Sequence, residues 1–334
     1  MLPQYRDKLV RDLPGMLAYP YFRGREAAWV LHQRLDHPQR IAELRRGPLA
    51  GLLDRPGVSD TVRACGDGRL TGPRLLPLAD PLHLFERERS LPAEKPAEAA
   101  FAALCQSDVL PFVVTFDSWV SDGDKDWQWH QTSRRGTNLV VQVNFPDAYC
   151  DAFYSGFGEH DRAMLEYWSH PVRRDGPITM SWARLDMEPG GEDVLIEEVQ
   201  TDWLRTLATN RANLQARRVK AEKHWIADFV DETALRYGKV WAEATMLAAV
   251  AVARNLLGAR RVWLHQPHTG AKLKRITDRQ PPRSLYSDLP RRFAFQPTHR
   301  APDFLYRTRS QAVHRLRRKQ SPVFWVLDFD APAV

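Results

Sequence analysis

The sequence predicts an α+β fold in which a mixed, mostly antiparallel sheet packs on a long buried helix. Segments 178–187 and 193–202 look like two strands, and Pro189-Gly190-Gly191 between them is typical of a hairpin turn. Residues 241–258 carry Ala, Leu and Val around the whole helical circumference and end at Gly258, which indicates a buried helix. A strand over 261–266 follows it directly.

The remaining elements complete a large C-terminal domain. Residues 281–295 predict a short helix that runs into a strand, and 322–330 predict a last strand. Alternating apolar residues predict strands over 110–120 and 137–145, and a long basic amphipathic helix is expected over about 204–236. We therefore expect a helical accessory region over 1–108 and an α+β domain over 109–334.

Composition narrows the class of protein. The chain is 43% hydrophobic and 27% charged, as in globular proteins, and no apolar run is long enough to span a bilayer. Cys65, Cys105 and Cys150 are widely spaced and form no CxxC pair, so neither a disulfide framework nor a zinc site is expected. We expect a cytoplasmic protein without a membrane partner.

The formal net charge is +7, which suits an acidic partner such as nucleic acid or a phosphorylated cofactor. The simpler interpretation is a solvated basic face.

The stretch VLIEEVQTDW (194–203) is the strongest candidate for a functional site. An apolar strand ends in Glu197, Glu198, Gln200 and Asp202, and Trp203 follows. Burying carboxylates without partners is costly, so a strand that carries them needs a reason. We interpret its acidic end as facing a cleft; the alternative is a solvated strand end.

Several other residues have both a functional and a structural interpretation. Trp129 and Arg134, in WQWHQTSRRG, suit stacking on a base or binding a phosphate, although a packed loop is the simpler interpretation. An i,i+4 salt bridge is expected between Lys239 and Glu243. His265 and His268 follow a strand with no adjacent carboxylate, so we expect them to be incidental.

The segment 178–330 resembles a domain of large polyvalent phage and prophage proteins. The similarity rests on EEVQTDW, on Lys239-Val240-Trp241-Ala242-Glu243 and on SLYSDLPRRFAF. The same order of elements is similar to the GNAT N-acetyltransferase superfamily. That resemblance implies acyl transfer from acetyl-CoA or another activated donor to a small-molecule or amine acceptor.

The resemblance also implies roles for individual residues. Tyr286 would be the general acid at the departing thiolate, and Glu198 the general base, with Gln200 beside it. Substrate-binding residues would include Glu197, Asp202, Trp203, Lys239, Trp129 and Arg134. A basic helix (204–223) follows the strand where those enzymes have a glycine-rich loop, which is consistent with an unusual donor such as an aminoacyl-tRNA.

Two alternatives remain open. The order of strands also fits a PD-(D/E)xK nuclease, in which Asp186 and Glu198 would hold Mg²⁺ and Gln200 would polarise water. The third alternative is a non-catalytic, phage-related interaction module. Nuclease chemistry needs Asp186 and not Tyr286, transfer chemistry needs Tyr286, and the interaction module needs neither.

Overall fold

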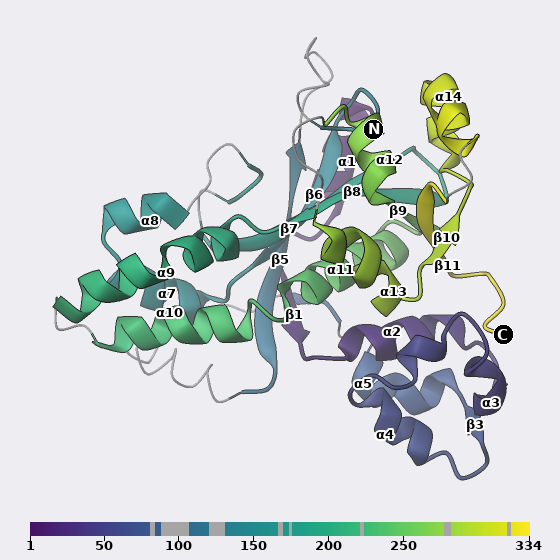
Figure 1. Cartoon of the computed structure of the whole chain (residues 1–334), viewed down its shortest axis with the longest axis horizontal. Coiled ribbons are helices and arrows are strands. Elements are labelled where there is room, and N and C mark those ends of the chain that lie inside the picture. Colours follow the sequence, from purple (N-terminus) through teal and green to yellow (C-terminus); the bar gives the residue numbers. More distant parts are fainter. Residues whose placement is uncertain are drawn as a thin grey trace.

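The computed structural model describes residues 1–80, 84–87, 107–119, 131–165, 170–173, 176–220, 224–276, 282–318 and 322–334. Within these ranges the main sheet consists of β1 (Leu17–Tyr21), β4 (Glu86–Arg87), β5 (Leu110–Trp119), β6 (Asn138–Asn144), β7 (Thr179–Met187), β8 (Asp193–Gln200), β9 (Arg261–His265), β10 (Gln296–Thr298) and β11 (Phe324–Asp328). Their order across the sheet is β10-β11-β9-β8-β7-β6-β5-β1-β4 (Figure 1). Only β8 and β9 pair in parallel among them. The predicted α+β fold with a mixed, mostly antiparallel sheet is confirmed.

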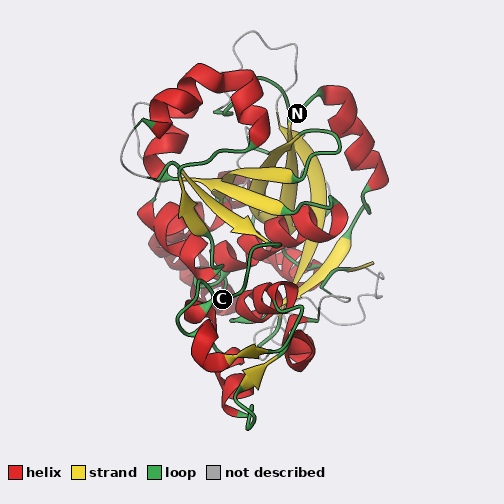
Figure 2. Ribbon diagram, turned by 90° about the vertical axis from the view of Figure 1, so that its right-hand side faces the viewer, coloured by secondary structure: helices red, strands yellow, loops and turns green. Residues whose placement is uncertain are grey.

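Helices lie around this sheet (Figure 2). Those of the described ranges are α1 (Pro3–Asp12), α2 (Arg25–Arg34), α3 (Ile41–Leu44), α4 (Val58–Arg63), α5 (Leu76–Ala79), α7 (Asp147–Gly156), α8 (Glu159–Leu165), α9 (Trp203–Lys220), α10 (His224–Arg236), α11 (Trp241–Ala251), α12 (Pro267–Leu273), α13 (Leu289–Arg292) and α14 (Asp303–Arg317). Short 3₁₀ segments are η1 (Ala50–Leu52) and η2 (Gly72–Leu75), and π-helical segments are η4 (Val252–Leu256) and η5 (Ser284–Asp288).

Helix α11 is the buried helix expected from its composition. Residues 243–251 are all buried, and the helix packs against β6, β7 and β8. Thr245 on α11 and Ser181 on β7 share a hydrogen bond of 2.6 Å between their hydroxyl oxygens. The chain continues through η4 to Gly258, whose φ of +73° suits glycine, and then enters β9. Helix α11 therefore lies on the crossover that makes β9 parallel to β8.

The N-terminal region contributes to the main sheet as well as forming helices. Strand β1 pairs with β5, and the hydroxyl of Tyr19 donates to Ala244 O of α11 at 2.9 Å. Helices α2 to α5 lie beneath the sheet in Figure 1, together with a small sheet of β2 (Gln39–Arg40) and β3 (Arg69–Leu70). The region expected to be a helical accessory thus holds strands of the large sheet.

Two helical predictions need correction. The single helix expected over about 204–236 is described as two helices, α9 and α10, which pack on each other. Helix α14 was not expected, because its many basic residues obscure a short apolar stripe. That stripe includes Phe304 and Leu305, which pack with Leu195 of β8 and Trp263 of β9.

Candidate functional site

Strands β8 and β9 diverge at the acidic stretch. They pair from Asp193 opposite Arg261 to Ile196 opposite Leu264. Beyond that point β8 continues alongside β7, whereas His265 of β9 pairs with β11. The edge of β8 beyond Ile196 therefore has backbone groups that β9 does not satisfy.

A β-bulge sits at the start of the divergence. Ile196 lies opposite Leu185 and Glu198 lies opposite Arg184, so Glu197 is the extra residue of β8. Bulges disrupt the ladder locally and re-aim side chains, and they are frequent near functional sites. The register places Glu198 beside Arg184 and Gln200 beside Trp182, so Glu198 and Gln200 share a face of the strand.

Glu197 lies at the centre of a fully buried polar cluster, here called the Glu197 cluster, with Ser133, His265 and Lys274. The backbone N–H of Ser133 donates to Glu197 Oε1 at 3.0 Å, and the Ser133 hydroxyl donates to Oε2 at 2.8 Å. His265 Nε2 lies 3.1 Å from the same Oε2 and 2.9 Å from Ser133 Oγ. Lys274 Nζ is 3.5 Å from Oε2 and also donates to the backbone carbonyl of Glu197.

The charges of the Glu197 cluster follow from these contacts. Burial alone would raise the pKa of Glu197, but Lys274 and the hydrogen bond from His265 hold that pKa well below its ordinary value. Burial lowers the pKa of His265 and that of Lys274. His265 is therefore neutral, with its proton on Nε2, because both neighbours of Nε2 are oxygens able to accept a hydrogen bond.

The Glu197 cluster is not a nucleophilic triad. In a triad the serine and the carboxylate bind opposite nitrogens of the histidine. Here Ser133 and Glu197 share Nε2, and Nδ1 of His265 has no hydrogen-bond partner in the described part of the chain. The cluster instead anchors the segment at Ser133 to β8.

We expect acid to destabilise the protein through the Glu197 cluster. Because the pKa of His265 is lowered on folding, the unfolded chain binds more protons near pH 6.5, and stability falls as the pH drops through that value. The depressed pKa of Glu197 extends the loss to lower pH. Urea unfolding between pH 8 and pH 5 measures this slope, and His265→Gln should flatten it between pH 7 and pH 5.5. An identical slope in the variant would contradict the assignment.

Glu198 and Tyr286 lie near each other, since the charge of Glu198 acts on the phenol of Tyr286. Glu198 forms an ion pair with the buried Arg184. Tyr286 belongs to η5 and is buried; burial raises the pKa of its phenol, and the charge of Glu198 raises it further. The backbone N–H of Val199 faces the Tyr286 hydroxyl and opposes this rise in pKa. Tyr286 thus reaches the edge of β8 that β9 leaves open.

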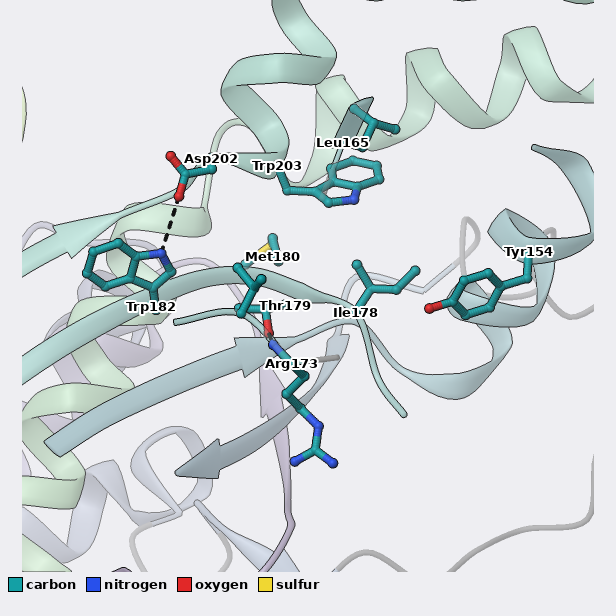
Figure 3. A pocket seen from close by; sticks show the side chains of 10 residues that line it. Tyr154, Leu165, Arg173, Ile178, Thr179, Met180, Trp182, Asp202 and Trp203 are labelled. Carbon is teal, nitrogen blue, oxygen red and sulfur yellow. Dashed lines mark hydrogen bonds between the residues drawn. The ribbon is translucent and has the colours of Figure 1, made fainter. Parts of the chain in front are cut away.

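Asp202 is the centre of a second cluster of polar side chains. Its carboxylate accepts hydrogen bonds from Gln200 Nε2 (2.6 Å), Arg205 Nη2 (2.5 Å), His170 Nδ1 (2.5 Å) and the indole of Trp182 (3.4 Å). Figure 3 shows the bond between Asp202 and Trp182. Burial would raise the pKa of Asp202, but the hydrogen bond from His170 lowers it below its ordinary value.

The cavity of Figure 3 is too small for a substrate. It has a volume of about 10 Å³, which is room for about one water, and Trp203 and Thr179 line it. Trp203 is buried in an aromatic cluster, with its ring centroid 5.0 Å from that of Phe145.

Other sequence candidates lie outside the divergence. Lys239 is exposed, and the salt bridge expected with Glu243 is wrong, because Glu243 pairs with Arg292. Arg134 is buried and binds Asp186 with its Nε at 2.7 Å, and its guanidinium lies 4.2 Å from the ring centroid of Phe304. Trp129 falls outside the described residues.

The carboxylates of the nuclease alternative are each engaged by cations of the chain. Asp186 accepts from Arg134 and from the ammonium of Met1 at 2.6 Å, and Glu198 pairs with Arg184. Across the described ranges, no three His, Cys, Asp or Glu side chains are grouped as metal ligands.

The positive charge of the basic helix α9 is partly neutralised by carboxylates. Arg205 pairs with Asp202, and Arg211 pairs with Asp231 on α10. The side chains of 215–220 lie outside the description.

Sequence reasoning missed Ser133, Arg184, His170 and Lys274, and it took His265 to be incidental. The statement that no carboxylate lies beside His265 is wrong, because Glu197 contacts it. Arg184 had a signal: counting back from the hairpin turn places it near Glu198, although the bulge shifts the register by one. The other contacts join segments far apart in the chain and left no local pattern.

Comparison with protein-family models, curated proteins and solved structures finds no match to this chain. In the described part of the chain, no helix has the length and apolar character needed to cross a membrane.

Proposed function

We propose that the protein transfers an acyl group from an activated donor to an amine, with the donor's acyl end bound where β8 and β9 diverge. The observation that carries the proposal is the position of Tyr286 and Glu198 beside the open edge of β8. The order of hairpin, helix α11, parallel strand β9 and tyrosine-bearing η5 supports it, since this is the order of the acetyltransferases that the sequence resembles.

The reaction assigned to this site is attack of a neutral amine on the carbonyl carbon of a thioester. A carbon–nitrogen bond forms and the carbon–sulfur bond breaks through a tetrahedral intermediate. Glu198 takes the proton that the amine loses, and the phenol of Tyr286 donates a proton to the departing thiolate. Burial keeps the Tyr286 phenol protonated, as a proton donor requires.

The backbone of β8 has a further role in this scheme. The backbone N–H of Val199 makes a hydrogen bond to the phenol oxygen of Tyr286. A fixed N–H at this position can stabilise the oxyanion of the intermediate. A bound thioester oxygen would replace the phenol as its partner.

The identity of the donor is part of the proposal. Acetyl-CoA is the simplest candidate. An aminoacyl-tRNA is the alternative, and its phosphates would lie along the basic helix α9, where Arg205 and Arg211 are about half exposed.

Calorimetric titration of acetyl-CoA into the purified protein tests the donor site. We expect saturable binding to the wild type, to Glu198→Gln and to Tyr286→Phe, because both groups act on the reacting atoms rather than on the nucleotide. Tyr19→Phe is a matched control, since it removes a buried hydroxyl of β1 that bonds α11. Absence of binding at millimolar acetyl-CoA would exclude that donor, and titration with an aminoacyl-tRNA would then test the alternative.

A further inference from the structure

Helix α14 is apolar on one side and basic on the other. From residue 303 to residue 318 the chain has five arginines and a single acidic residue, Asp303. Four apolar side chains of the helix are buried against β8 and β9: Phe304, Leu305, Val313 and Leu316. The exposed side chains of its second half are Gln311, His314, Arg315 and Arg318. The helix lies at the edge of the molecule in Figure 1, so this basic side faces solvent.

A kink at Arg309 divides α14 into two helical stretches. The backbone of Arg309 is not helical, with φ −137° and ψ 32°. The ring of Tyr306, from the first stretch, meets the ring of His314, from the second, with 5.9 Å between the centroids and a tilt of 51°. His314 is exposed and Tyr306 is half-buried, so a ligand can reach this aromatic pair.

The arginines of the two stretches differ in their partners. Arg307, in the first stretch, pairs with Glu188, which follows β7. Arg315 and Arg318, in the second stretch and at its end, form no ion pair with any residue that the structure describes. The second stretch therefore carries positive charge that the described residues do not neutralise.

Two further arginines raise the positive potential at the kink. Burial lowers the pKa of the Arg309 guanidinium, and the charge of Arg275 lowers that pKa further. Arg275 follows α12 and is exposed. Two like charges are thus held close enough to repel each other, which favours a bound anion nearby.

Exposed arginines in the N-terminal region have a different environment. Arg45 pairs with Asp54 at 3.1 Å, and Arg63 pairs with Asp60 one helical turn away. Each of these positive charges is balanced by a neighbouring carboxylate. They provide a matched comparison for Arg315, because they are exposed and carry the same charge.

The combination of charge and aromatic rings fits one class of ligand. Guanidinium groups bind phosphate oxygens through charge-assisted hydrogen bonds, which any polyanion with phosphates could use. An accessible aromatic pair between the arginines adds a surface on which a base can stack. The bases of a duplex are already stacked on one another, whereas those of a single strand are free to stack on protein rings.

We propose that α14 binds single-stranded nucleic acid, with phosphates held by Arg315 and Arg318 and a base stacked on the rings of Tyr306 and His314. RNA and DNA share this chemistry. The surface is separate from the basic helix α9, which lies on the opposite side of the molecule in Figure 1. The inference does not depend on the acyl transfer proposed above.

Fluorescence anisotropy with labelled oligothymidylate and oligouridylate of about 15 nucleotides tests the proposal on the full-length protein. We expect saturable binding at low salt, and the tighter of the two identifies DNA or RNA as the ligand. The double variant Arg315→Gln/Arg318→Gln should weaken binding by about tenfold or more. It should also lower the slope of log K against log salt by about 1.4, since each phosphate contact to a single strand contributes about 0.7.

The control variant is Arg45→Gln/Arg63→Gln, which removes the same charge from exposed positions far from α14. It should leave the affinity and the salt slope nearly unchanged, because those arginines are already paired with carboxylates. Equal losses in the two double variants would show that only the net charge matters and would overturn the proposal. Absence of saturable binding to either oligonucleotide would overturn it as well.

Two substitutions at His314 test the stacking. His314→Phe keeps an aromatic ring and His314→Ala removes it, while both lose the imidazole nitrogens, so their difference reports on the ring alone. We expect His314→Ala to bind about fivefold or more weakly than His314→Phe, with the same salt slope. Equal affinities of the two variants, or a duplex that competes as well as the single strand, would contradict the assignment.

Discussion

Replacing Glu197 by glutamine should lower the free energy of unfolding by about 3–5 kcal/mol, which is the loss typical when one partner of a buried ion pair is removed. Glutamine keeps the shape of the side chain, but its single amide oxygen can accept only one of the two hydrogen bonds that Ser133 donates. It leaves the ammonium of Lys274 buried without a countercharge. Urea or thermal unfolding at pH 7 measures the change.

A second variant separates the charge from the packing. Glu197→Gln combined with Lys274→Met removes both charges, so the double variant should recover about 2 kcal/mol of the loss or more. Glu188→Gln is the matched control, because Glu188 forms ion pairs but is 26% exposed, and it should cost no more than about 1 kcal/mol. If Glu197→Gln is no more damaging than this control, the Glu197 cluster does not hold β8 as described.

Replacing Tyr286 by phenylalanine should reduce acyl transfer by about 10²–10⁴-fold with little change in stability. The phenol is the proposed proton donor to the thiolate, and general acids typically contribute this much to the rate. The lost contact is a single hydrogen bond, worth about 1 kcal/mol of stability. Release of free thiol from acetyl-CoA, measured with a panel of amines, gives the rate.

Tyr19→Phe is the control that shows whether the loss of acyl transfer is specific to Tyr286. Tyr19 is also buried, and burial raises the pKa of its phenol well above the ordinary value, but it lies on β1 rather than at the divergence. Its loss should leave thiol release unchanged. Equal rates of thiol release for Tyr286→Phe and the wild type would show that Tyr286 takes no part in the reaction.

Much of the fold could be predicted from the sequence, because its main helices and strands have recognisable local residue patterns. The turn residues Pro189-Gly190-Gly191 define the hairpin, and the uniform apolar composition of α11 predicts a helix buried all round. Helix α14 was missed because its apolar residues are few and lie among arginines. Strand β1 was missed because its partner, β5, is nearly a hundred residues away along the chain.

The candidate site could be predicted from the sequence only in part. The stretch VLIEEVQTDW pointed to Glu197, Glu198, Gln200 and Asp202, and the structure places all four beside cations or polar partners. It did not reveal the partners themselves, since Ser133, Lys274 and His170 come from distant segments. The β-bulge is equally invisible in the sequence. It brings Glu197 into the Glu197 cluster while Glu198 faces Arg184, so two adjacent carboxylates have different surroundings.

The central claim is that the acyl donor binds at the open edge of β8, and the amide of Val199 reports on it directly. We would titrate acetyl-CoA into protein labelled with ¹⁵N-valine and follow this amide, assigned by its absence in Val199→Ala. A saturable shift of the Val199 resonance, with the same dissociation constant as in calorimetry, is the predicted result. Binding by calorimetry that leaves Val199 unshifted would place the donor elsewhere and contradict the claim.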